Sequence, residues 1–141
     1  SPHTLSIGVI GPGTVGRVLL DQLAAQCEQL RRQFRLDLRV RGIMGSQRML
    51  LADTNVPISD WRAQYQHSTR AADVARFVEH VRLDYLPHTV LVDCTASEGV
   101  AAHYADWLAA GIHIVTPNKK ANSGDFAYYR RLQSARRSGA S

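Results

Sequence analysis

Three glycines spaced as G-x-G-x-x-G follow directly on a short apolar run near the start of the chain. The run is Leu5 to Ile10, and the glycines are Gly11, Gly13 and Gly16. The first glycine of such a motif permits a tight turn off a strand, the second leaves room for a pyrophosphate, and the third lets a helix pack close to the sheet. The helix N-terminus then offers unpaired N–H groups and a partial positive charge to a phosphate. The stretch therefore predicts the strand, turn and helix start of a dinucleotide-binding unit.

An amphipathic segment comes immediately after the glycines. Between residues 14 and 34, apolar side chains recur every three or four positions, at Val15, Leu19, Leu23, Cys27, Leu30 and Phe34. This spacing predicts one helix with a single buried face. A plain strand–turn–helix connection without a ligand is the alternative interpretation, because three spaced glycines alone are a weak signal.

The remaining pattern alternates strands and helices. Further strands are predicted at 36–44, 90–94 and 112–116, and further helices at 73–82, 98–110 and 125–137. Residues 45–60 have an irregular pattern, in which Ser59 or Asp60 would cap a short helix through Gln66. Gly42 interrupts the second strand and indicates a close backbone approach. No clear strand is expected between 45 and 88.

This order predicts the α/β class, with a Rossmann-like, doubly wound and mostly parallel sheet in three layers. A length of 141 residues, of which 45% are hydrophobic, fits a single domain spanning the chain. No apolar run approaches the roughly 18 residues of a membrane span, and no export leader is present, so we expect a cytoplasmic protein without a membrane partner. Ser1 in place of Met indicates that the chain is a piece of a larger protein.

Charge and cysteine usage exclude other classes. The net charge of +5 is compatible with a nucleic-acid partner, but the arginines are scattered and no basic–aromatic ladder is present, so we expect none. A basic balance also suits a polyphosphate cofactor. Cys27 and Cys94 lie in apolar patterns that are typical of reduced core residues. The histidines and cysteines lack metal-ligand spacing, so no metal is assigned.

The end of the second strand bears on the choice of cofactor. A free ribose 2′-hydroxyl usually meets an Asp or Glu at this position. Here the sequence is Met44-Gly45-Ser46-Gln47-Arg48, without an acid. Ser46 and Arg48 are instead suited to a 2′-phosphate, which favours NADP while NAD is possible. The alternative is that Arg48 is an ordinary exposed loop arginine.

Two further segments follow strand ends on the same edge of the sheet. Thr95, Ala96 and Ser97 are small residues against which a nicotinamide ribose would fit, and Ser97 would equally serve as a helix N-cap. Lys119 follows the last strand and would meet the cofactor, a substrate carboxylate or a developing alkoxide. A solvated lysine is the alternative interpretation.

The residues resemble the nucleotide-binding domain of homoserine dehydrogenase, in the form fused to an aspartokinase. The likeness covers nearly the whole chain, and its stretches are Ile10-Gly11-Pro12-Gly13-Thr14-Val15-Gly16, Leu38-Arg39-Val40-Arg41-Gly42-Ile43, Val92-Asp93-Cys94-Thr95-Ala96-Ser97 and Val115-Thr116-Pro117-Asn118-Lys119-Lys120-Ala121-Asn122. The last stretch is the most specific.

The resemblance implies an NAD(P)-dependent interconversion of L-aspartate 4-semialdehyde and L-homoserine, on the route to threonine and methionine. It places cofactor contacts on Gly11, Gly13, Thr14, Val15, Arg48, Thr95 and Lys119. In the family a substrate domain follows this segment, so the chain alone is expected to bind cofactor without turnover, and the whole enzyme is expected to be a homo-oligomer. A regulatory module that binds a dinucleotide without chemistry is the rival, although such a module would need no lysine at position 119.

Overall fold

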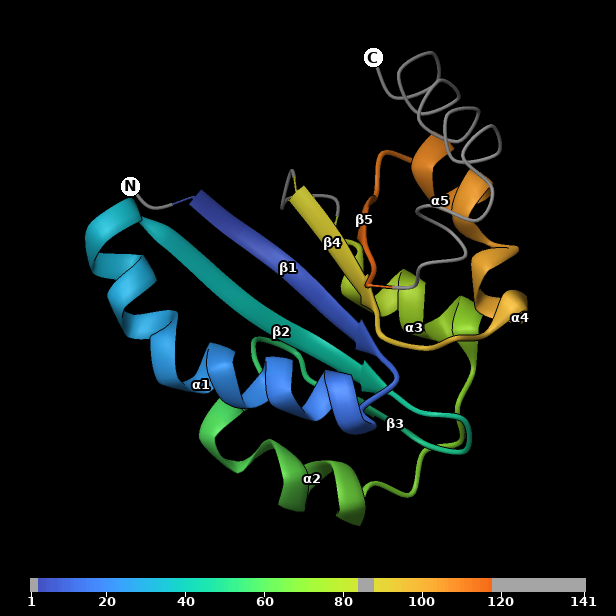
Figure 1. The fold of residues 1–141 in the computed structure, drawn as a ribbon, viewed down its shortest axis with the longest axis horizontal. Helices are drawn as coiled ribbons and strands as arrows, with labels where there is room; N and C mark the ends of the chain where they lie inside the picture. Colours follow the sequence, from blue (N-terminus) through green and yellow to red (C-terminus); the bar gives the residue numbers. More distant parts are fainter. Residues whose placement is uncertain (1–2, 84–87, 118–141) are drawn as a thin grey trace.

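The computed structural model describes residues 3–83 and 88–117, and Figure 1 shows their arrangement. The strands are β1 (His3–Ile10), β2 (Leu36–Met44), β3 (Met49–Leu51), β4 (His88–Asp93) and β5 (His113–Val115). The helices are α1 (Thr14–Phe34), α2 (Trp61–His67), α3 (Val74–Val81), α4 (Glu98–Ala101) and α5 (Tyr104–Ala109), with a 3-10 turn, η1 (Ile58–Asp60), before α2. The helix predicted at 125–137 lies outside the described residues.

The five strands form one sheet in the order β3-β2-β1-β4-β5. β1 pairs in parallel with both β2 and β4, and β4 pairs in parallel with β5. The chain therefore extends the sheet first to one side of β1 and then to the other, which confirms the doubly wound, mostly parallel prediction.

β3 corrects the expectation that no strand lies between 45 and 88. It pairs antiparallel with β2 after a tight turn, in which the Gly45 N–H donates to the Arg48 carbonyl at 2.9 Å. A strand of three residues is too short to show a period of two, so the sequence pattern carried no signal for it.

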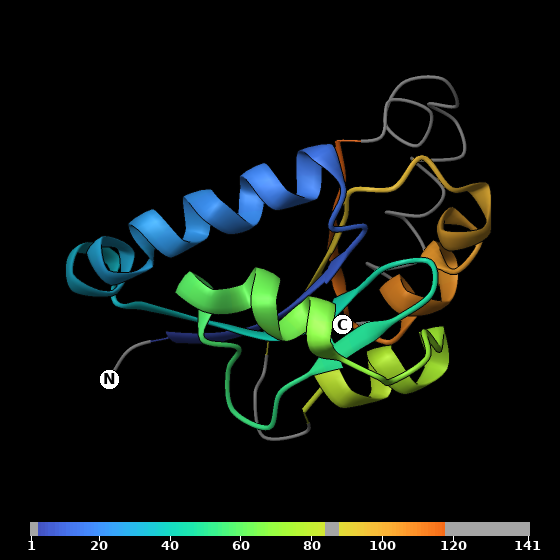
Figure 2. The same cartoon turned by 90° about the horizontal axis from the view of Figure 1, so that it is seen from below.

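Helices cover both faces of the sheet, and each face has its own apolar core (Figure 2). Leu20 of α1 and Trp61 of α2 pack on one face, against Val9 and Ile43 among others. Phe77 of α3 packs on the opposite face, as do the aromatic and aliphatic residues of α5. This is the predicted three-layer architecture.

α1 has the predicted bounds, and its predicted face is confirmed in part, since its half-buried residues include Leu19, Leu23, Cys27 and Leu30. Gly16 and Leu20 are buried, whereas Val15 is 53% exposed and Phe34 is 62% exposed. A Cβ on Gly16 would lie only 2.1 Å from the Gly11 carbonyl oxygen. The third glycine of the motif must therefore face the turn, and this contact fixes the rotation of the helix.

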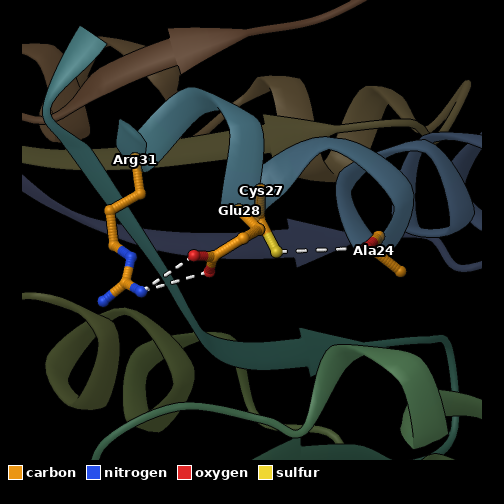
Figure 3. Close-up of polar contacts among 4 residues, drawn as sticks. All are labelled: Ala24, Cys27, Glu28 and Arg31. Atoms are coloured by element: carbon orange, nitrogen blue, oxygen red, sulfur yellow. Dashed lines mark hydrogen bonds and ion pairs between the residues drawn. The ribbon is translucent and has the colours of Figure 1, made fainter. Parts of the chain in front are cut away.

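Cys27 is only half-buried on α1. Its Sγ lies 4.0 Å from the Ala24 carbonyl oxygen, and the exposed Arg31 and Glu28 pair one turn further on (Figure 3). The prediction of a core cysteine therefore holds only in part at this position.

The other predicted helices are confirmed with changes at their ends. Asp73 caps α3 by accepting from the Arg76 N–H at 3.1 Å. Of the two predicted caps of α2, Ser59 lies inside the 3-10 turn, whereas Asp60 is the N-cap residue but makes no side-chain capping bond. The helix predicted at 98–110 is divided into α4 and α5, and Gly111, at φ 84°, ends α5 as expected.

Candidate functional site

The glycine turn lies where β1 ends between β2 and β4. The Gly11 N–H donates to the Met44 carbonyl at 2.8 Å, and the Cys94 N–H donates to the Ile10 carbonyl at 2.8 Å. Gly11 has φ 88°, and a Cβ there would lie 2.7 Å from Cγ2 of Thr95. Position 11 thus requires glycine both for its backbone conformation and for the close approach of Thr95.

Gly13 is open where its neighbours are crowded. A Cβ on Gly13 would meet no heavy atom within 4 Å. The residue is the N-cap of the 21-residue helix α1, without a side-chain cap and without an acidic residue in the first turn. The helix N-terminus therefore keeps its partial positive charge beside an open space, and this arrangement suits a phosphate group.

An apolar hollow of about 530 Å³ adjoins this turn, between α1 and the ends of β4 and β5. It is lined by Thr14, Val15, Val18, Leu19, Gln22, Val92, Cys94, Val115, Thr116 and Pro117. Burial raises the pKa of the Cys94 thiol, and the neighbouring Asp93 carboxylate raises it further, so the wall remains uncharged at neutral pH. The exposure of Val15 in this hollow accounts for its absence from the core.

The loop after β4 is held by its own side chains. Asp93 Oδ1 accepts from the Thr95 N–H at 2.9 Å and from Thr95 Oγ1 at 2.6 Å. Ser97 Oγ accepts from the Val100 N–H at 3.2 Å, so Ser97 is the N-cap of α4, as predicted. Ala96 between them is exposed. This loop contacts the glycine turn through Thr95.

The end of β2 carries the residues predicted to select the cofactor. Ser46 is exposed in the turn, and the half-buried Arg48 donates from Nη1 to the Gln66 carbonyl at 2.5 Å. The guanidinium thus lies at the C-terminal end of α2, at the rim of the same edge of the sheet.

Tyr65 is a residue at this edge that the sequence patterns did not single out. A Cβ on Gly45 would lie 2.1 Å from the Tyr65 hydroxyl oxygen and 3.7 Å from Cδ of Pro12. Burial raises the pKa of Tyr65, against a smaller opposing effect of Arg48. The Tyr65 hydroxyl therefore lies against Gly45, in the turn that carries Ser46 and Arg48, at a position that the sequence pattern of α2 does not indicate.

The structure thus brings together most of the predicted cofactor residues. Gly11, Gly13, Thr14, Val15, Gly16, Thr95, Ala96 and Ser97 gather where β1 and β4 end, and Ser46 and Arg48 follow the end of β2. The predicted catalytic residue, Lys119, lies outside the described residues. Within 3–83 and 88–117, no helix is both long and apolar enough to cross a membrane, and no group of three or more His, Cys, Asp or Glu side chains is arranged to hold a metal ion.

Comparisons with known proteins identify the family. The family described as "Homoserine dehydrogenase, NAD binding domain" matches residues 11–141. The chloroplastic bifunctional aspartokinase/homoserine dehydrogenase of Daucus carota is 47% identical over 138 residues, which are 97% of this chain and 15% of that protein. The homoserine dehydrogenase of Saccharomyces cerevisiae is 33% identical over 136 residues, which are 94% of this chain and 36% of that protein.

A solved structure has the same fold. It is a hyperthermophilic archaeal homoserine dehydrogenase in complex with NADPH, with a TM-score of 0.70 and 23% identity, over 98% of this chain and 42% of that one. The chain spans only a minor part of each of these relatives. The match over residues 11–141 and the 47% identity agree on one assignment: the chain belongs to the family of homoserine dehydrogenase NAD-binding domains.

Proposed function

We propose that this chain is the cofactor-binding domain of an enzyme that interconverts L-aspartate 4-semialdehyde and L-homoserine. The observation that carries the proposal is the open space at Gly13, at the N-terminus of α1 and beside the loop that follows β4. The named activity of the carrot and yeast relatives supports it. A nicotinamide dinucleotide bound there would supply the hydride that is exchanged with the substrate.

Different groups of the described residues would bind different parts of that cofactor. The N–H groups at the start of α1 would bind the pyrophosphate, Thr95 and Ser97 would support the nicotinamide ribose, and the hollow beside Val15 would exclude water from the ring. Lys119 would meet the cofactor ribose or the substrate. The substrate itself would bind mainly to residues outside this chain, and the expected homo-oligomer and cytoplasmic location stay predictions.

We infer further that NADP is preferred to NAD. No acidic residue stands in the turn after β2 to accept a 2′-hydroxyl or to repel a 2′-phosphate. Ser46 and Arg48 offer a hydroxyl and a guanidinium instead. The archaeal structure, described as a complex with NADPH, is consistent with this choice.

Calorimetric titration of the chain with NADPH and NADH tests cofactor binding, and the chain is expected to bind NADPH more tightly. Incubation of the chain with NADP and homoserine should give no sustained turnover, because the substrate-binding residues would lie elsewhere. Turnover above the blank would contradict the inference that the substrate-binding residues lie outside this chain. Failure to bind either nucleotide would contradict the proposed function.

A chimera tests the chemistry and excludes the rival, a sensing module without catalysis. Residues 1–141 would replace the matching segment of the carrot enzyme, and homoserine oxidation would be assayed. We expect activity in the chimera, a large loss of turnover in Lys119→Ala and a smaller loss in Lys120→Ala. A folded, NADPH-binding but inactive chimera would favour the sensing module, and equal small losses at the two lysines would indicate a solvated pair.

A further inference from the structure

Asp93 is a fully buried carboxylate at the carboxyl end of the central strand β4. Its exposed fraction is 0%, and its hydrogen bonds join two segments of the chain. Oδ1 accepts from the N–H and the hydroxyl of Thr95, and Oδ2 accepts from the hydroxyl of Tyr104 in α5. Burying a carboxylate is costly unless donors surround it, so these bonds hold Asp93 and its partners in one arrangement.

Thr95 connects Asp93 to the glycine turn. Its hydroxyl donates to Asp93 and also accepts from the Ser97 N–H at 3.2 Å. Its methyl group, Cγ2, occupies the space beside Gly11 where a Cβ would lie 2.7 Å away. With both branches of the side chain engaged, Thr95 has a fixed rotamer, and the loop after β4 is aligned with the turn after β1.

Tyr104 anchors the other oxygen of the carboxylate. The ring is buried, with 3% exposed, and it packs against Trp107 at a centroid distance of 6.0 Å. Burial and the bond to Asp93 raise the pKa of Tyr104, which outweighs the opposing hydrogen bond of Thr116. The tyrosine therefore remains a protonated donor throughout the neutral range. Through Thr116 the same network reaches the segment that follows β5.

We propose that Asp93 is a positioning residue that holds Thr95 and the loop after β4 in the geometry that binds the nicotinamide half of the cofactor. The inference rests on the proposed function, since it assumes a nicotinamide dinucleotide at this edge. The adenosine half would bind at the far side of the glycine turn, beside Gly45 and Arg48. Loss of the network should therefore weaken the two halves of the cofactor unequally, whereas a purely stabilising role would affect neither half selectively.

The test compares two ligands on the 141-residue chain: NADPH, and 2′,5′-ADP, which lacks the nicotinamide half. Asp93→Ala is expected to weaken NADPH by about tenfold or more, because several hydrogen bonds to a charged group are lost. Binding of 2′,5′-ADP should change by less than about twofold, measured at a temperature where the variant is folded by circular dichroism. Asp93→Asn keeps the shape and one acceptor, so it should retain part of the NADPH affinity.

Ser6→Ala is the matched control. Ser6 is also fully buried on the sheet, and its hydroxyl donates to the Val81 carbonyl at 2.5 Å, on the α3 side and away from the glycine turn. This variant should lose stability without changing either affinity. If Asp93→Ala does not fold, Tyr104→Phe replaces it as the test variant, because it removes one hydrogen bond to Asp93. We expect it to weaken NADPH binding by about threefold or more and to leave 2′,5′-ADP binding unchanged.

Three outcomes would overturn the inference. Equal weakening of both ligands would make the role of Asp93 general stability, and unchanged binding of both would remove the role altogether. If the unsubstituted chain binds 2′,5′-ADP as tightly as NADPH, the nicotinamide half adds no affinity, and Asp93 has no nicotinamide site to position. A parent chain that binds neither ligand would instead contradict the proposed function itself.

Discussion

The ring of Phe77 lies directly against Gly42, so that a Cβ on Gly42 would lie 2.6 Å from Cε1 of the ring. Gly8 on the neighbouring strand faces the same ring, with 2.9 Å between a Cβ and Cε2. Because neither glycine has a side chain, the ring of Phe77 in α3 can pack directly against the two strands. The sequence predicted a close backbone approach at Gly42, and the structure places the side chain of Phe77 there instead.

Gly42→Ala should destabilise the fold by about 1–3 kcal/mol, because the added methyl overpacks a core that has no room for it. Chemical denaturation of the chain measures the loss. Gly99→Ala is the control, because a Cβ there would meet only Ser97 Oγ at 3.5 Å. The double variant Gly42→Ala with Phe77→Leu should recover part of the lost stability. If Gly42→Ala has the same free energy of unfolding as the unsubstituted chain, α3 can move away from the sheet without a loss of stability.

Gly13→Val should retain the fold and lose cofactor affinity. The space around Gly13 is open, because a Cβ there has no heavy atom within 4 Å, so a valine should fit the fold while occupying the volume that the pyrophosphate would need. We expect NADPH binding to weaken by at least about tenfold, equivalent to 1.4 kcal/mol. Gly11→Val provides the contrast, since its φ of 88° and the contact with Thr95 should cost stability as well. Unchanged NADPH binding by Gly13→Val would place the phosphate elsewhere.

Stability should fall as the solution becomes alkaline. The pKa values of Cys94, Tyr65 and Tyr104 are raised in the folded chain, chiefly by burial, above ordinary values of about 8.5 for a thiol and about 10 for a tyrosine hydroxyl. The unfolded chain therefore releases these protons at lower pH than the folded chain, and the free energy of unfolding decreases as pH rises past those ordinary values.

Denaturant unfolding between about pH 7 and 11 measures this decrease, and Tyr104→Phe isolates the contribution of Tyr104 from those of Cys94 and Tyr65. The variant should lose less stability above about pH 10 than the parent chain, because it has one buried hydroxyl fewer to ionise. Cys94→Ser should remove the earlier part of the decrease, which begins near the ordinary pKa of a thiol. If the free energy of unfolding depends on pH in the same way in the unsubstituted chain and in Tyr104→Phe, Tyr104 does not contribute to the decrease over this pH range.

The long, regular features of the fold could be predicted because each depends on neighbours in sequence. β1, α1, β2 and β4 have clear periodicity, and the glycine motif identified the edge where the site lies. The predicted face of α1 is confirmed in its middle but not at its ends, where Val15 and Phe34 are exposed. At the first turn the contact of Gly16 with Gly11 sets the orientation of the helix, which hydrophobicity alone did not indicate. β3 was missed because pairing with β2 defines it, and its own three residues carry no pattern.

The parts of the site that escaped prediction depend on contacts between distant segments. Contacts outside the site escaped prediction for the same reason: Arg41 is an extra residue on β2, where the register with β1 shifts, and its guanidinium donates to the Asp53 carbonyl at 2.8 Å. Tyr65 reaches Gly45 only because Asp21 of α1 fixes α2, by accepting from Trp61 Nε1 at 3.2 Å. Asp93 ends an apolar strand, and nothing in its sequence neighbourhood indicates that a tyrosine eleven residues later binds it.

The proposed preference for NADP depends on the position of Arg48. Its guanidinium donates to the Gln66 carbonyl, a bond to a neutral acceptor that leaves other N–H groups of the fork for a phosphate. The half-exposed side chain lies beyond Tyr65 at the end of β2, so a 2′-phosphate would meet it in a partly solvated setting. Salt should screen such an ion pair.

Arg48→Ala should therefore abolish most of the preference for NADPH while leaving NADH binding nearly unchanged. A charge-assisted hydrogen bond contributes about 1.5–3 kcal/mol, so the parent chain should favour NADPH by roughly ten- to a hundredfold. Paired titrations with both cofactors, repeated at raised ionic strength, measure the preference and its screening. Arg62→Ala is the matched control, because it removes the same charge from the other end of α2, where Arg62 pairs with Asp21 at 2.7 Å. If Arg48→Ala weakens both cofactors equally, the arginine acts by holding α2 in place and does not recognise the 2′-phosphate.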